Sequence, residues 1–166
     1  MEALTAIATR KSVRAFLPEQ ISTDDLNTIL GAGSSAPVAL GDYGNVHFTV
    51  IQKKEMLVQL GGRKSPFYDA PTLVLISAKK THYPNIEFFN VGCILENMFL
   101  AATTLGLGSV FISSASEVAQ SDPKLLAALD LPRHFFPVAA VVLGYSKEPI
   151  KETTAFKNKV KVNRIV

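Results

Sequence analysis

Five consecutive residues near the start of the chain have the clearest potential for chemistry: Arg10, Lys11, Ser12, Val13 and Arg14. Alternate side chains of an extended chain share a face, so Arg10, Ser12 and Arg14 should point one way, about 6 to 7 Å apart in succession. Guanidinium groups bind phosphate bidentately, and a hydroxyl adds a further hydrogen bond. The pattern predicts an anion site. A basic turn in which Arg10 only favours a helix C-terminus is the alternative.

The chain does not match the common sequence motifs for nucleotide or metal binding. Residues 62–65 read Gly-Arg-Lys-Ser and lack the glycine spacing of a P-loop. Phe111 stands where a dinucleotide fingerprint starting at Gly106 would need its third glycine. The three histidines are far apart in the sequence, so no metal site is predicted. No pairing of a nucleophile with a base stands out, so we expect no catalytic side chain. If the protein is an enzyme, its reactive group would then belong to a cofactor.

The length of the chain favours one globular domain over residues 1–166. The net charge of +3 comes from basic clusters at both ends, and these lack the interleaved aromatics or motifs of a nucleic-acid surface. The single cysteine, Cys93, excludes an internal disulfide, so we expect a cytoplasmic setting. No secretory signal or apolar stretch long enough to span a bilayer is apparent, so no membrane partner is predicted.

Hydrophobic periodicity predicts helices and strands mixed around one sheet, which makes the fold class α+β or α/β. A capping box at Ser22 and Asp25 begins one helix, which Gly31 and Gly33 are expected to end. A long helix over residues 86–105 is apolar nearly all round and should bury Cys93. Further helices are predicted at 54–60 and after Asp122-Pro123, and strands at 46–52, 72–78, 109–113 and 138–144. Near the C-terminus, Val160 and Val162 alternate with lysines, which predicts another strand.

The order and spacing of several sequence blocks resemble the nitroreductase family. That family opens with a helix followed by Arg-(Arg/Lys)-Ser-(Val/Ile)-Arg-x-Phe, which matches residues 10–16. Further matches follow in order over residues 1 to about 148: a helix over 21–32, Ala-Pro-Val at 36–38, Tyr-Asp-Ala-Pro-Thr at 68–72, Gly-Cys-Ile-Leu-Glu-Asn-Met at 92–98, a block over 100–109, and one over 136–145. Each block is weak alone, but their order is specific.

The resemblance implies a nitroreductase-like fold, with a central, mostly antiparallel sheet flanked by helices. It implies a homodimer with FMN at the subunit interface and C-terminal strand exchange between subunits. Arg10, Ser12 and Arg14 would hold the phosphate, the ribityl chain and one polar edge of the flavin ring, and Lys11 would add a backbone contact. The remaining implied flavin contacts are Pro37 and Val38 beside the ring, Ser113 and Ser114 near its N5 edge, and Lys157 or Lys159 at the phosphate.

The function implied by the resemblance is ping-pong oxidoreduction. NADH or NADPH would deliver hydride to the flavin N5, and a small-molecule acceptor such as a nitroaromatic or quinone would then take the electrons. One departure is the loop at 40–46, Leu-Gly-Asp-Tyr-Gly-Asn-Val, which lacks the polar run that many family members carry there. This loop gives weight to an alternative, a non-catalytic flavin-binding or regulatory protein on the same fold. A basic interaction protein without flavin is a third hypothesis.

Overall fold

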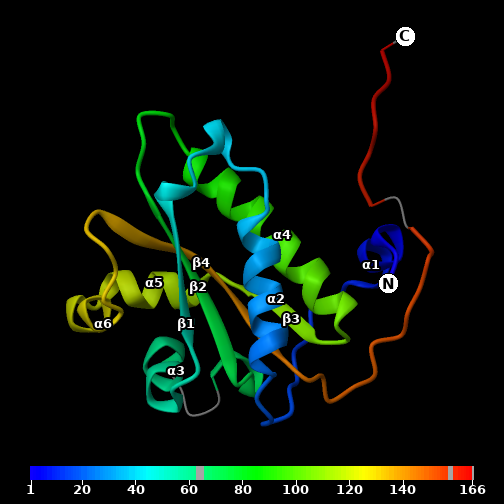
Figure 1. Ribbon diagram of the computed structural model, residues 1–166, viewed down its shortest axis with the longest axis horizontal. Helices are drawn as coiled ribbons and strands as arrows, with labels where there is room; N and C mark the ends of the chain where they lie inside the picture. Colours follow the sequence, from blue (N-terminus) through cyan, green and yellow to red (C-terminus); the bar gives the residue numbers. More distant parts are fainter. Residues whose placement is uncertain (63–65, 157–158, 166) are drawn as a thin grey trace.

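The computed structural model describes residues 1–62, 66–156 and 159–165. Its centre is a four-stranded sheet in the order β1-β2-β4-β3, in which every neighbouring pair is antiparallel (Figure 1). Helices flank both faces, which confirms the predicted α+β class and the central antiparallel sheet. The strands are β1 (Val46–Ile51), β2 (Thr72–Lys79), β3 (Gly108–Ile112) and β4 (Phe135–Gly144).

The helices divide between two hydrophobic cores, one on each face of the sheet. The first core joins the sheet to α3 (Lys54–Gly61), α5 (Ser114–Ser121) and α6 (Pro123–Ala128). The second joins it to α2 (Thr23–Ser34) and α4 (Ile86–Thr104), while α1 (Ala3–Thr9) lies beside the end of α4 (Figure 1). Short 3₁₀ turns complete the described chain: η1 (Ala39–Gly41), η2 (Tyr43–Asn45) and η3 (Pro66–Asp69).

The apolar run of β2 supplies both cores, because side chains alternate between the two faces of a strand. Leu73 and Leu75 enter the core beside α3 and α5, whereas Val74 and Ile76 enter the core beside α2 and α4. All four side chains are fully buried. A strand covered on both faces reads as a continuous apolar run, which is why the sequence located it correctly.

The capping box that begins α2 is confirmed, since the Asp25 backbone N–H donates to Ser22 Oγ at 3.0 Å. The predicted end of this helix is wrong. The helix continues through Gly31 and Gly33 to Ser34. A Cβ at position 33 would lie 2.4 Å from the end of the Met98 side chain. Gly33 therefore allows α2 to approach α4 closely and does not act as a helix terminator.

The expectation that α4 is buried nearly all round is also wrong. One stripe of this helix faces outward, including Phe89, which is 67% exposed, Cys93 and Glu96. Cys93 is therefore an exposed free thiol and not a core residue. Periodicity misled here because most positions on the stripe are apolar or small, so no polar stripe marks the outward face.

The α4 segment also has the length and composition of a membrane-spanning helix, contrary to the expectation that no stretch does. Within its most apolar window 44% is buried inside the protein, and the core helices of globular proteins meet the same criterion. The predicted C-terminal strand does not form within the chain, because residues 159–165 have no strand partner in it. In Figure 1 this last part of the chain runs away from the sheet and helices.

Candidate functional site

The Arg10–Arg14 segment follows α1 and joins the outer edge of β3. The Val13 backbone N–H donates to the Ser109 carbonyl at 3.0 Å, and Ser12 and Ser109 form a parallel bridge. Val13 is 4% exposed, whereas Ser12 and Arg14 are exposed. The predicted alternation holds only for Ser12, Val13 and Arg14, with Val13 in the core and its two polar neighbours outside it. The expectation that Arg10, Ser12 and Arg14 share one face is wrong, because Lys11 and not Arg10 gathers with Ser12 and Arg14.

Two facing glycines let this segment lie close to the sheet. Gly108 and Gly144 are register partners on β3 and β4, and Phe16 packs over both. A Cβ at Gly108 would lie 3.0 Å from side-chain atoms of Val13 and Phe16, closer than side chains normally pack. The segment is held from its other side as well, where the Lys147 backbone N–H donates to the Ala15 carbonyl at 3.0 Å. The backbone that carries the basic residues is thus fixed on both sides.

Basic and hydroxyl side chains surround a hollow of about 240 Å³ along this segment. Its polar lining comes from Lys11, Ser12, Arg14, Ser146 and Glu148. Lys11 Nζ also donates to the Pro149 carbonyl at 3.4 Å. Two cations, two hydroxyls and a single carboxylate suit the phosphate and hydroxyl groups of a ribitol phosphate. The hollow is smaller than the 300–1,000 Å³ typical of cofactor sites, so it would hold only part of such a ligand.

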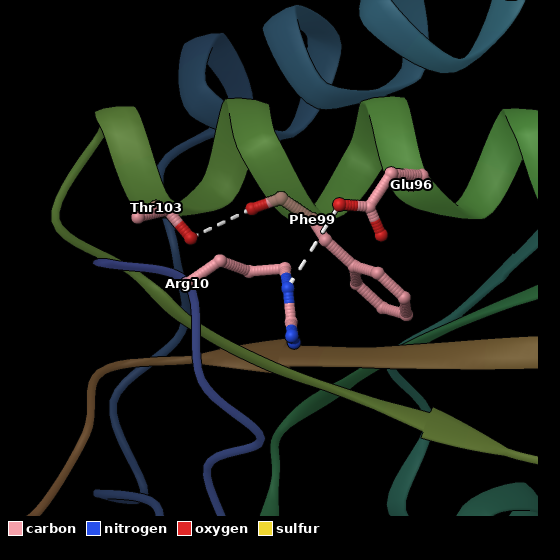
Figure 2. Close-up of polar contacts among 4 residues, drawn as sticks. All are labelled: Arg10, Glu96, Phe99 and Thr103. Atoms are coloured by element: carbon pink, nitrogen blue, oxygen red, sulfur yellow. Dashed lines mark hydrogen bonds and ion pairs between the residues drawn. The ribbon is translucent and has the colours of Figure 1, made fainter. Parts of the chain in front are cut away.

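Arg10 does not line this hollow. Its guanidinium lies against α4, where Arg10 Nε is 3.8 Å from Glu96 Oε1 (Figure 2). The Arg10 and Glu96 side chains are 31% and 51% exposed, so water reaches the pair. Glu96 did not emerge from the sequence as a functional residue. The available signal was that Glu96 is one of only two carboxylates in a mostly apolar helix, the other being Glu87.

Pro37 and Val38 lie elsewhere in the chain. They follow α2, where Pro37 is exposed and Val38 is buried in the core beside α4. The next residue, Ala39, donates its backbone N–H to Asn90 Oδ1 at 2.9 Å, close to the beginning of α4. Arg10 approaches the second half of the same helix (Figures 1 and 2). One chain therefore does not bring its Ala-Pro loop to its own basic segment.

The remaining predicted contacts are also separate from the hollow. Ser113 directly precedes α5 and Ser114 is the first residue of that helix, and both are exposed. Ser114 lines a different hollow, of about 290 Å³, together with Tyr68 and Ile112. Lys159 is exposed in the C-terminal tail, and Lys157 lies outside the described residues. Among the residues that the structure describes, no three His, Cys, Asp or Glu side chains gather as metal ligands would.

Comparisons with known proteins agree with this geometry along nearly the whole chain. The structure superposes on a Bacteroides fragilis nitroreductase solved with bound FMN with a TM-score of 0.79 and 31% sequence identity, covering 99% of this chain and 100% of the other. An Archaeoglobus fulgidus protein with the provisional name NADH dehydrogenase/NAD(P)H nitroreductase is 32% identical, over 89% of this chain and 87% of its own length. A Bacillus subtilis FMN reductase [NAD(P)H] is 25% identical, over 87% of this chain and 66% of its own.

The fold and the basic segment on the sheet edge thus place the chain among proteins built like FMN-binding nitroreductases. The model of the Nitroreductase family matches residues 7–63 and 57–145, which is most of the chain. The chain belongs to the nitroreductase family.

Proposed function

We propose that this chain is an FMN-dependent NAD(P)H oxidoreductase that reduces small oxidised acceptors such as nitroaromatics or quinones by a ping-pong mechanism. Its likeness to the FMN-bound Bacteroides fragilis nitroreductase over almost all of both chains carries the proposal. When bound, FMN supplies the redox chemistry by accepting hydride from the nicotinamide and passing electrons to the acceptor. No side chain of this protein is assigned a covalent role.

The basic segment fits the anionic end of FMN. Arg14 and Lys11 supply positive charge at the hollow, Ser12 supplies a hydroxyl, and Arg10 adds a second guanidinium from the α4 side. Hydrogen bonds from ionised donors to phosphate are about twice as strong as neutral ones. The Val13 and Phe16 contacts fix the backbone, so these side chains need little reorganisation on binding. We assign Arg10, Lys11, Ser12 and Arg14 to the flavin phosphate and ribityl chain.

An anaerobic titration tests the catalytic proposal. Protein reconstituted with FMN should lose its oxidised-flavin absorbance when NADH or NADPH is added, and a nitroaromatic or quinone added afterwards should restore it. The mechanism needs both halves of this cycle. Flavin that binds but is not bleached by either nicotinamide would instead support a non-catalytic flavin-binding protein. The loop over residues 40–46 favours that second candidate, because it begins with Leu40, an 81% exposed apolar side chain in the left-handed region at φ 60°.

We also propose a homodimer with the flavin at the subunit interface. The basic segment and the Ala-Pro loop lie apart in one chain, so a second copy must supply Pro37 and Val38 if both regions touch one flavin. Apolar side chains on three elements support this idea: Leu4 is 66% exposed on α1, Phe89 is 67% exposed on α4, and Val160 is 80% exposed in the tail. A second copy would cover such surface.

The C-terminal tail is the part we expect to be exchanged between subunits. Thr153 anchors its start to the same chain, because the Thr9 hydroxyl accepts the Thr153 backbone N–H at 3.0 Å. Beyond that point Val160 and Val162 alternate with Lys159 and Lys161. The strand order makes β1 a sheet edge, and an edge strand can accept a further strand. We propose that the tail of the partner subunit pairs with this edge.

Removing residues 156–166 should convert the dimer to a monomer at micromolar concentration and weaken FMN retention, because the exchanged strand and its apolar side chains are lost. Analytical ultracentrifugation and the ratio of flavin to protein absorbance measure the two effects. The matched control replaces Lys159 and Lys161 with glutamine, which keeps the alternation of Val160 and Val162 and should leave the dimer intact. A truncated chain that still sediments as a dimer contradicts strand exchange.

The single-domain organisation over residues 1–166, with an extension from about residue 149, is part of the same proposal. So is a reducing, cytoplasmic setting. It is supported by the only cysteine of the chain being the exposed free thiol of Cys93.

A further inference from the structure

The ion pair between Arg10 and Glu96 is the only one among the residues that the structure describes, and it joins the basic segment to α4. Arg10 directly follows the last residue of α1, and Glu96 belongs to the exposed stripe of α4. Neighbouring polar groups of the helix are already paired, since the Thr103 hydroxyl donates to the Phe99 carbonyl at 2.8 Å (Figure 2). Glu96 is therefore the group of this helix surface that meets Arg10.

The guanidinium nitrogen that Glu96 contacts decides which nitrogens of Arg10 are left for a ligand. The contact is made at Nε, the nitrogen nearest the aliphatic stem, at 3.8 Å from Glu96 Oε1. Figure 2 shows the terminal nitrogens of Arg10 pointing away from the carboxylate and away from α4. Those nitrogens form the forked end that binds phosphate oxygens bidentately. Glu96 thus engages one edge of the guanidinium and leaves its phosphate-binding end free.

We propose that Glu96 is a positioning residue, which holds the Arg10 side chain along α4 and leaves its terminal nitrogens available to the FMN phosphate. This inference rests on the proposed FMN function and deepens it. A long arginine side chain loses rotamer freedom when it binds a ligand. An ion pair that restricts the Arg10 side chain beforehand reduces this loss, so FMN binds more tightly without any direct contact between Glu96 and the flavin.

The negative charge of Glu96 also has an effect that opposes FMN binding. A carboxylate close to the phosphate site repels the ligand, and it also competes for Arg10. Contact at Nε, and not at the terminal nitrogens, argues against competition for the phosphate-binding end. Both side chains are partly exposed, so water and salt screen the charges and the net effect is modest. We expect loss of Glu96 to weaken FMN binding by about three- to tenfold, the range for failing to fix one long side chain.

The test compares two flavins that differ only in the phosphate. The dissociation constants of FMN and riboflavin are measured by flavin fluorescence with wild-type apoprotein and with Glu96→Gln, which keeps the size of the side chain and removes its charge. Glu96→Gln should raise the Kd for FMN by about three- to tenfold. It should leave the Kd for riboflavin within about twofold, because riboflavin offers Arg10 no phosphate. A general structural role would weaken both flavins equally.

Three controls make the outcome specific. In an Arg10→Ala background, Glu96→Gln should cause no further loss, because no guanidinium remains to be oriented. Glu117→Gln, at an exposed carboxylate on α5, should change neither constant. Sedimentation of each variant checks that the oligomeric state is unchanged. Tighter FMN binding by Glu96→Gln, equal losses for both flavins, or an equal loss in the Arg10→Ala background each overturns the positioning role. Wild-type protein that binds no FMN would overturn the proposed function itself.

Discussion

Arg14→Ala is expected to raise the Kd for FMN by about 10- to 100-fold, enough for the protein to lose its yellow colour during purification. The reason is the loss of charge-assisted hydrogen bonds to phosphate, each worth about 1.5–3 kcal/mol. Arg14 lines the hollow on the basic segment and has no ion pair among the described residues, so its charge is available to a ligand. Arg10→Ala should act in the same direction. The ratio of flavin to protein absorbance after gel filtration measures both variants.

Arg133→Ala is the matched control for these variants, because Arg133 is exposed in the turn before β4 and does not line the hollow. It should retain as much FMN as the wild type. Full flavin content in both Arg10→Ala and Arg14→Ala would show that the basic segment is not the phosphate site. Equal losses in all three variants would point to a general charge effect and would also contradict the assignment.

Phe16→Ala is expected to reduce the free energy of unfolding by about 3–5 kcal/mol, the cost of truncating a fully buried phenylalanine. Phe16 is completely buried and packs over the facing glycines 108 and 144. For a domain of this size the loss corresponds to a melting temperature about 6–20 °C lower. Flavin retention should fall too, because the same side chain fixes the basic segment against the sheet. Circular dichroism during heating measures the stability change.

Tyr83→Ala provides the comparison for Phe16→Ala, since it removes an aromatic side chain that is 47% exposed in the loop before α4. Its effect on the melting temperature should be small, because less apolar surface leaves water when this residue folds. Phe16→Ala protein that melts within about 2 °C of the wild type would contradict the packing described for this segment.

The sequence pattern located those helices and strands whose formation depends on a few neighbouring residues. The doubly buried run of β2 and the serine cap of α2 are where the sequence predicts them, because burial on both faces and a capping hydroxyl act over a few residues. Local pattern failed for α5, since the segment over 114–121 has a weak apolar face and was not predicted. It also failed for Gly33, where the cause is the approach of Met98 from another helix.

The candidate site also has one feature that local sequence predicts and one that it does not. The alternation of Ser12, Val13 and Arg14 could be predicted, because the two faces of an extended segment follow from backbone geometry alone. The contact of Arg10 with Glu96 could not, because it joins residues 86 positions apart in the sequence.

The sequence by itself determined the extended basic segment and the family, and through the family resemblance the α+β class, because these depend on residue order and short-range periodicity. Only the tertiary structure decided which face of α4 is exposed, that Arg10 turns toward Glu96, and that the Ala-Pro loop lies away from the basic segment of its own chain. The physical reason is that exposure and ion pairing depend on which distant surfaces meet when the two cores close around the sheet.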